Sequence, residues 1–283
     1  MNIITSISDM QRTADAWRRE GKRIAVVPTM GYLHEGHLSL IAVAKKHSDV
    51  IITTIFVNPT QFSPSEDFSK YPRDIPRDKQ LAESAGTDVL FIPAEKEMYP
   101  EHFVTFVNAE TITIVLEGKI RPTHFRGVTT VVAKLFNITK PHVAVFGQKD
   151  AQQAVVIQRM AKDLNFDIDI IIAPIVREVD GLAMSSRNVY LSPDERKQAT
   201  VLHRSLQLAT QFIETGEQSC HTIIEKMTAL ISEQPSASID YISIANSSTL
   251  QELSNLTKGD AILISLAARF GSTRLIDNIK VQL

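Results

Sequence analysis

Short apolar segments alternate with amphipathic segments over the first 176 residues of the chain. The apolar segments have the length of strands, which is typical of strands buried on both faces of a parallel sheet. They occupy residues 23–29, 49–59, 87–93, 142–147 and 168–176. The amphipathic segments predict helices at residues 36–49, 73–86, 128–141 and 151–165, and another helix from about Ser8 to Gly21 precedes the first strand.

This alternation predicts an α/β fold with a Rossmann-like, doubly wound parallel sheet that carries helices on both faces. Residues 103–113 (FVTFVNAETIT) predict an extra strand outside the alternation. The first strand of the sheet is expected at residues 23–29.

The alternation ends after Val176. A loop is predicted over residues 177–192, with Ser192 also beginning a long helix at 192–216. A second helix at 220–234 and strands at 239–246, 261–270 and 273–278 follow. Ser192, Pro193 and Glu195 suit the N-cap, first-turn and capping-box positions of the long helix. We therefore expect a Rossmann-like domain at residues 1–176 and a smaller C-terminal α+β domain at 177–283.

Composition narrows the class of protein. The net charge is −2, so no global basic field would attract nucleic acid. The chain has one cysteine, Cys220, and cannot form an intrachain disulfide. No apolar run reaches the length of a membrane-spanning helix, and the N-terminus lacks the pattern of a signal peptide. These features favour a cytoplasmic protein with small-molecule partners, without nucleic acid and without a membrane.

The stretch VPTMGYLHEGHLSL at residues 27–40 carries two histidines at a passage from strand to helix. Ligands of open α/β sheets bind at the carboxyl ends of the strands, and a helix N-terminus favours phosphate. Residue chemistry leaves three interpretations of His34 and His37 open: contacts to nucleotide phosphates, a solvated surface, or metal ligation. The spacing HEGH does not match the zinc motif HExxH.

Three further segments place polar side chains at strand ends or in loops. FVNPTQF at residues 56–62 offers the amides of Asn58 and Gln61, although an Asn-Pro turn is the simpler interpretation. VFGQKDAQQ at 145–153 offers Lys149 to phosphate, and Asp150 either to a ribose or as a helix cap. MSSRN at 184–188 places hydroxyls and a guanidinium in a loop that suits phosphate or is simply surface.

HEGH and AMSSRN resemble the two signature segments of the HxGH nucleotidyltransferases. The whole set, with YPRD, RPTHFRGVTTVVAKLFN and the C-terminal RLIDN, closely resembles the pantothenate synthetase (pantoate–β-alanine ligase) family over essentially the entire chain. Two positions depart from the family pattern: Gln148 replaces an acidic residue and Ala151 replaces an aromatic one.

The resemblance implies an ATP-dependent ligase that condenses pantoate with β-alanine through a pantoyl-adenylate, giving pantothenate, AMP and pyrophosphate. It implies a homodimer, Mg²⁺ carried with ATP, and no metal site of the protein's own. The loop at residues 63–71 and the domain at 177–283, acting as a lid, are expected to exclude water from the adenylate. Asp78 is a candidate outer ligand of Mg²⁺, although a solvated helix acid is the simpler interpretation.

The resemblance also assigns roles to individual residues. The implied catalytic residues are His37, His34, Lys149, Ser185, Ser186 and Arg187. ATP binding is implied for Met30, Gly31, Tyr32, Leu33, His34, Glu35, Gly36, His37, Gly147, Gln148, Lys149, Asp150, Val176, Met184, Ser185, Ser186 and Arg187. Gln61 and Gln153 are implied to bind pantoate, with Gln61 also bordering β-alanine.

Two other functions stay open from the residues alone. One is a nucleotidyltransferase that adenylates a different small acid. The other is a nucleotide-sensing or RNA-binding protein that kept the fold and lost the chemistry, because fold does not determine function.

Overall fold

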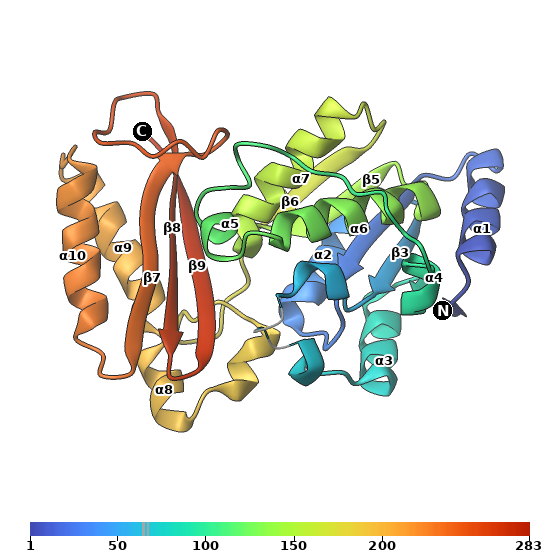
Figure 1. Ribbon diagram of the computed structural model, residues 1–283, viewed down its shortest axis with the longest axis horizontal. Coiled ribbons are helices and arrows are strands. Elements are labelled where there is room, and N and C mark those ends of the chain that lie inside the picture. Colours follow the sequence, from blue (N-terminus) through green and yellow to red (C-terminus); the bar gives the residue numbers. More distant parts are fainter. Residues whose placement is uncertain (64–65, 67) are drawn as a thin grey trace. The chain divides into compact units, whose positions relative to one another are not determined.

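The computed structural model describes residues 1–63, 66 and 68–283 (Figure 1). The chain divides into two compact units, one made of Met1–Gly147 and Val156–Pro174, the other of Gln148–Val155 and Ile175–Leu283. The expected closing loop at residues 63–71 includes positions 64, 65 and 67, which lie outside the described residues.

The first unit contains a six-stranded sheet in the order β1-β4-β3-β2-β5-β6, in which all paired strands are parallel. Its strands are β1 (Asn2–Ile4), β2 (Ile24–Thr29), β3 (Val50–Ile55), β4 (Val89–Phe91), β5 (Val143–Gly147) and β6 (Asp169–Ala173). The doubly wound parallel sheet is therefore confirmed. The expectation that the sheet begins at residues 23–29 is wrong, because the short β1 precedes it and pairs with β4.

Helices cover both faces of this sheet. The helices of the unit are α1 (Ile7–Arg19), α2 (Glu35–Ala44), α3 (Ile75–Ala85), α4 (Glu95–Met98), α5 (Glu117–Ile120), α6 (His124–Thr139) and most of α7 (Ala151–Asp163). Apolar side chains of α1, α6 and α7 form one core with the sheet. Those of α2 and α3 pack on the other face, α2 against β2, β3 and β5.

The strand order reverses between β2 and β5. These two strands are neighbours in the sheet, although β3 and β4 separate them in the sequence. This reversal is a topological switch point, where open α/β sheets bind their ligands. The loop before α2 leaves the carboxyl end of β2, and Gly147 ends β5. The first-unit part of the candidate site therefore lies where this fold class places ligands.

The predicted strand at residues 103–113 is wrong. Residues 103–110 form neither strand nor helix. The N–H of Val107 donates to Thr130 Oγ1 at 3.0 Å, and its carbonyl accepts from Thr129 Oγ1 at 2.7 Å. Side chains of α6 therefore form hydrogen bonds with the Val107 backbone groups that would otherwise pair with a neighbouring strand.

The second unit has a three-stranded antiparallel sheet in the order β7-β8-β9. Its strands are β7 (Ala237–Asn246), β8 (Ala261–Phe270) and β9 (Thr273–Gln282), and α9 (Val201–Glu214) and α10 (Cys220–Ser232) pack on it through one apolar core (Figure 1). The expected C-terminal α+β arrangement is confirmed.

The long helix predicted at residues 192–216 is instead two helices, α8 (Pro193–Gln198) and α9. The Thr200 N–H and hydroxyl both donate to the Lys197 carbonyl, a tight turn that ends α8. The start of α8 agrees with the sequence, since Ser192 is its N-cap, Pro193 lies in its first turn and Glu195 completes the capping box.

Among the described residues, no helix is long and apolar enough to cross a membrane.

Candidate functional site

The predicted site residues are divided between the two units. Met30 to His37, Gln61 and Gly147 belong to the first unit. Gln148 to Asp150, Gln153, Val176 and Met184 to Arg187 belong to the second. Each set has its own supporting contacts.

The loop from Met30 to Leu33 is held in an unusual backbone conformation. Gly31 has φ +86° and Tyr32 has φ +51°, in the left-handed region. A Cβ at Gly31 would lie 3.0 Å from Ile55 Cγ2 and 3.1 Å from Asp78 Oδ2, so glycine suits this position in both conformation and size. Leu33 is fully buried and packs with Ile55 in the core beneath the loop.

Asp78 fastens this loop from helix α3. Its Oδ2 accepts from the Tyr32 N–H and its Oδ1 from the Leu33 N–H, both at 2.7 Å. The interpretation of Asp78 as a solvated helix acid is wrong, because its exposed fraction is 0%. Burial raises the pKa of this carboxyl, while the two backbone N–H groups and Arg77 oppose the rise. Its role in the structure is to shape the loop.

His34 and His37 together cap the N-terminus of α2. His34 is the N-cap residue, and its Nδ1 accepts from the Gly36 N–H at 3.2 Å. His37 occupies the third helical position, and its Nδ1 accepts from the His34 N–H at 3.3 Å. The two ring centroids are 4.1 Å apart.

This arrangement determines the tautomers. A ring nitrogen that accepts a hydrogen bond carries no proton, so this geometry corresponds to the tautomer of each ring with its proton on Nε2. Both rings therefore present an Nε2–H donor at the positive end of a helix dipole. The two histidines of HEGH thus have a structural role as caps, and that role orients their donors.

Gln61 lies in the 3₁₀ turn η1 (Pro59–Gln61) with its side chain nearly buried. Its Oε1 accepts from Asn58 Nδ2 at 3.0 Å, and its Nε2 lies 3.3 Å from Met30 Sδ. Asn58 is itself oriented, because its Nδ2 also donates to the Gly127 carbonyl and its Oδ1 accepts from the Tyr99 hydroxyl. The structure thus brings Gln61 to Met30 and presents the Gln61 amide as a donor.

Helix α6 holds the backbone of η1. A Cβ at Gly127 would lie 2.5 Å from Thr60 C and O and 2.6 Å from Gln61 N, so this close approach requires glycine. His124, one turn earlier, contacts the Gln61 carbonyl through Nδ1 at 3.0 Å. Burial, aided by the charge of Arg121, lowers the pKa of His124 to about 4. The ring is therefore neutral at pH 7, and its Nδ1–H donates to Gln61.

Arg121 supports the same turn. Its Nε and Nη2 donate to Glu66 at 2.9 and 2.6 Å, and Nη2 also lies 3.4 Å from the Gln61 carbonyl. Burial alone would raise the pKa of Glu66, but the hydrogen bonds and charge of Arg121 outweigh it and lower that pKa. Glu66 therefore stays ionised and holds the guanidinium beside η1.

In the second unit, a short hairpin precedes the serine-rich loop. Val176 accepts from the Met184 N–H at 3.0 Å, and Arg177 pairs with Ala183 as an isolated β-bridge. Ser185 then caps the 3₁₀ helix η4 (Ser186–Tyr190), its Oγ accepting from the Arg187 N–H at 3.3 Å. The predicted ATP-binding residues Val176 and Met184 are thus joined directly.

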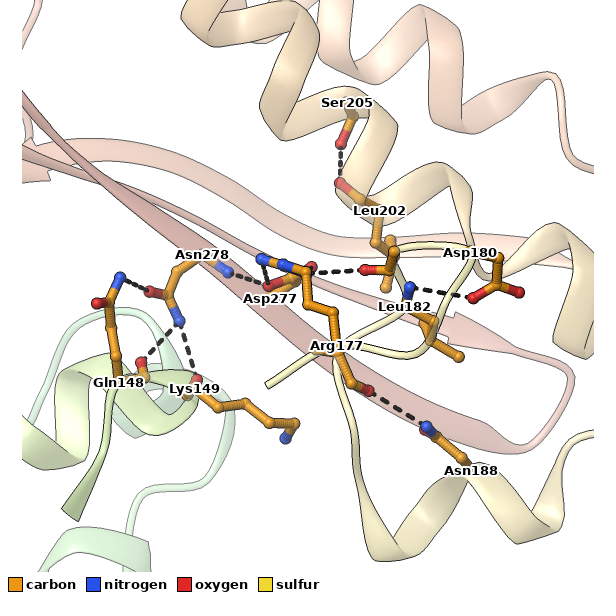
Figure 2. A network of polar contacts seen from close by, with 12 residues as sticks. Gln148, Lys149, Arg177, Asp180, Leu182, Asn188, Leu202, Ser205, Asp277 and Asn278 are labelled. Atoms are coloured by element: carbon orange, nitrogen blue, oxygen red, sulfur yellow. Dashed lines mark hydrogen bonds and ion pairs between the residues drawn. The ribbon is translucent and has the colours of Figure 1, made fainter. Parts of the chain in front are cut away.

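The other second-unit residues lie on the 3₁₀ turn η3 (Gln148–Asp150) and the start of α7. Lys149 and Gln153 are half-buried, and Asp150 is exposed. The carbonyls of Gln148 and Lys149 accept from the carboxamide of Asn278 in β9 (Figure 2). The turn that carries Lys149 is therefore fastened to the C-terminal strand.

Sequence reasoning assigns no supporting role to the residues that hold the site from a distance, and names Asp78 only as a candidate Mg²⁺ ligand or a solvated acid. The supporting residues lie far along the chain from the groups that they hold: Asp78, Arg121, His124, Gly127 and Asn278. The segments RPTHFRG and RLIDN contribute to the family resemblance without a role for any one of their residues. The sequence signal that could reveal such supporting residues is an ionisable or amide side chain among apolar residues, because such a side chain requires a partner when it is buried.

Residues 1–63, 66 and 68–283 contain no group of three or more His, Cys, Asp or Glu side chains placed to hold a metal ion. Asp78 offers two oxygens, but both accept backbone N–H groups.

Known proteins match the chain over its full length. A sequence profile of the family described as pantoate–β-alanine ligase matches residues 2–280. The pantothenate synthetase of Chloroherpeton thalassium is 55% identical over 284 residues, which cover 100% of both chains. The chain belongs to the pantoate–β-alanine ligase family.

Solved structures of this family have the same fold. Pantothenate synthetase from Thermus thermophilus superposes with a TM-score of 0.93 at 42% identity, covering 100% of both chains. Pantoate–β-alanine ligase from Francisella tularensis, crystallised in complex with β-γ ATP and β-alanine, gives a TM-score of 0.80 at 35% identity and covers 99% of this chain and 97% of that one. The predicted family, fold class and enzyme class are therefore confirmed.

Proposed function

We propose that the chain condenses pantoate with β-alanine in two steps that consume ATP. In the first, a pantoate carboxylate oxygen attacks the α-phosphorus, and pyrophosphate leaves. In the second, the amine of β-alanine attacks the acyl carbon of pantoyl-adenylate and loses a proton, and AMP leaves with the oxygen that bridged carbon and phosphorus. Family membership supports this reaction, and the ligands of the Francisella tularensis relative agree with it.

The paired histidine cap of α2 is the observation that carries the proposal. Two Nε2–H donors at a helix N-terminus can meet the oxygens of a triphosphate and the negative charge that grows as pyrophosphate departs. His34 is assigned as a phosphate ligand. His37, the predicted proton donor, is assigned as the Nε2–H hydrogen-bond donor to the departing pyrophosphate, because a neutral ring that gave up this proton would become an imidazolate. The Asp78-fastened backbone from Met30 to His37 would follow the phosphates.

Gln61 is assigned to pantoate. Its Oε1 is engaged by Asn58, so its Nε2–H₂ is the end that can donate to a carboxylate or hydroxyl. This amide is held by packing and by backbone contacts from α6, which keeps its direction constant. Gln153 is assigned to the same substrate, and Gln61 would also border β-alanine.

The second-unit residues are assigned to the nucleotide. Lys149, Ser185, Ser186 and Arg187 supply the positive charge and hydroxyl donors suited to phosphate oxygens. Gly147, Gln148, Asp150, Val176 and Met184 are assigned to the nucleoside, with Asp150 accepting from a ribose hydroxyl. The departures at Gln148 and Ala151 leave each of these donors and acceptors in place.

ATP would enter as its magnesium complex, with Mg²⁺ held by phosphate oxygens and water, as this ion prefers. Asp78 is not needed as a ligand, because its oxygens are engaged by the loop. We also propose a homodimer that works in the cytoplasm; sedimentation showing only monomer at micromolar concentration would reject the dimer. The closing roles of residues 63–71 and 177–283 stay predictions.

The test is a substrate-omission assay of the purified chain with ATP, Mg²⁺ and pantoate, in which pyrophosphate, AMP and ADP are measured separately. We expect pantoate-dependent pyrophosphate release, with sustained AMP and pantothenate formation only when β-alanine is added. If no acid-dependent pyrophosphate forms with pantoate but another small acid supports it, the substrate assignment is wrong. Tight ATP binding without turnover for any acid would identify a nucleotide-binding protein instead.

A further inference from the structure

Asn278 is a buried amide in the last strand of the chain, and its exposed fraction is 3%. Its Nδ2 donates to two consecutive backbone carbonyls, Gln148 O at 3.0 Å and Lys149 O at 2.9 Å. Its Oδ1 accepts from Gln148 Nε2 at 3.4 Å. Figure 2 shows the Asn278 carboxamide at the centre of these contacts, with the Lys149 side chain extending away from it.

Only a carboxamide of this length matches the partners. Both hydrogens of Nδ2 are directed at carbonyl oxygens, and a carboxylate of the same shape has acceptors alone. Aspartate at position 278 would therefore place negative charge against two carbonyl dipoles. An apolar side chain would leave two acceptors and the Gln148 amide without this partner, which is costly in a buried position.

The preceding residue anchors the strand on its other side. The Asp277 carboxylate, buried with 2% exposure, accepts two bonds from Arg177, at 2.6 and 3.0 Å. Arg177 also donates to the Gly181 carbonyl at 3.0 Å, within the hairpin that leads to Ser185. The backbone N–H of Asn278 donates to Asp277 Oδ1 at 2.8 Å, so the Asp277 carboxylate also holds the backbone at position 278.

We propose that Asn278 is a positioning residue for Lys149 in the adenylation step. By fixing the carbonyl of Lys149 and that of the residue before it, Asn278 sets the direction in which the lysine leaves the turn η3. Asp277 and Arg177 keep the same strand at a constant separation from the loop that carries Ser185 to Arg187. This inference rests on the proposed contact between Lys149 and phosphate.

The test combines Asn278 variants with removal of Lys149. Asn278→Asp, Asn278→Ala and Asn278→Ser, which retains one donor, are compared with the wild type and with Lys149→Ala, alone and combined. Asn246→Ala is the matched control, because Asn246 also bonds two consecutive backbone groups, the N–H groups of Ser248 and Thr249, at 2.9 and 3.0 Å. Each variant is measured for Tm, for kcat and for the KM of ATP.

We expect Asn278→Ala to lower pantoate-dependent kcat by about 10- to 100-fold, the range for misplacing a charge-stabilising group by up to about 1 Å. Asn278→Asp should lose more and Asn278→Ser less. In the Lys149→Ala background, Asn278→Ala should change kcat less than about twofold, because the group being positioned is gone. Asn246→Ala should lower Tm with kcat unchanged.

Two results would overturn the inference. One is an Asn278→Ala variant that loses Tm like Asn246→Ala yet keeps wild-type kcat. The other is an equal fold-loss of kcat with and without Lys149, which indicates a purely structural role. A wild-type chain that forms no AMP rejects the proposed function itself. A Lys149→Ala variant with wild-type kcat rejects the assigned role of Lys149. The inference falls in both cases.

Discussion

Replacing Gly127 by alanine has two opposing effects: it improves the local helix propensity, and it places a Cβ too close to the turn that carries Gln61. Gly127 lies in the first half of α6, where alanine is about 1 kcal/mol more favourable than glycine. Propensity alone therefore predicts a stabilised helix. The added Cβ, however, would lie 2.5 Å from the carbonyl carbon and oxygen of Thr60 and 2.6 Å from Gln61 N.

The size of the clash sets the expected effect. The contacting atoms are backbone atoms, so no side-chain rotation relieves them, and ordinary contact requires at least 3.4 Å. The turn η1 must then move by about 1 Å, which carries Gln61 with it and strains the Asn58 bond to the Gly127 carbonyl. Overpacking of this kind costs about 1–3 kcal/mol of stability. A displacement of about 1 Å can cost about 100-fold in rate.

The assay separates pantoate from ATP. For Gly127→Ala, we expect kcat/KM for pantoate to fall about 100-fold, while the KM for ATP changes less than about threefold. The loop at Met30–His37, which we assign to ATP, is fastened by Asp78 instead. A thermal unfolding curve serves as the control that the variant is folded at the assay temperature. Wild-type kcat/KM for pantoate in a folded variant would refute the reasoning, as would equal losses for both substrates.

Three further predictions concern other supports of the site. His37→Ala should lower the adenylation rate by about 10²–10³, as for loss of one transition-state donor. His37→Glu, which keeps a cap acceptor but has no donor when ionised, should lose at least as much. A loss under about threefold in single-turnover rates removes His37 from this role. Asp78→Asn should place an amide N–H₂ against the N–H of Tyr32 or Leu33. We expect the free energy of unfolding in denaturant to fall by about 1–3 kcal/mol and the KM for ATP to rise. An unchanged unfolding midpoint with an unchanged KM would contradict this prediction. Burial lowers the pKa of His124 from 6.5 to about 4, so the stabilisation of the native state by the neutral ring is complete above pH 6.5 and is lost as pH falls toward 4. The total loss of unfolding free energy is about 3 kcal/mol. The unfolding free energies of wild type and His124→Asn should diverge by that amount between pH 7 and pH 4, and parallel curves would refute the prediction.

The sheet can be predicted from the sequence because its central strands, β2 to β5, are buried on both faces and therefore appear as apolar runs. β1 escapes prediction because three residues, Asn2–Ile4, carry too little pattern. The strand predicted at residues 103–113 is rich in aromatic and β-branched residues, but the backbone groups of Val107 bond Thr130 and Thr129 instead of a strand. The break between α8 and α9 depends on local hydrogen bonds of Thr200 that periodicity does not reveal.

The candidate site is predictable where it is local. HEGH lies at a recognisable strand-to-helix passage, and the capping bonds of His34 and His37 involve residues two and three positions apart. The supports are remote: Asp78 reaches back to Tyr32, and Asn278 to Gln148. A single sequence lists these side chains but does not give the distances between them. A buried acid that accepts from backbone N–H groups therefore cannot be told from a solvated acid by sequence pattern alone.

The central claim is that a pantoate oxygen becomes the bridge of an acyl adenylate, and isotope transfer tests it most directly. The chain is incubated with pantoate carrying ¹⁸O in both carboxylate oxygens, unlabelled ATP, Mg²⁺ and β-alanine, and the AMP formed is examined by mass spectrometry. We expect one ¹⁸O in the phosphate of each AMP formed with pantothenate. AMP without label, or ADP as the nucleotide product, would contradict the two-step reaction.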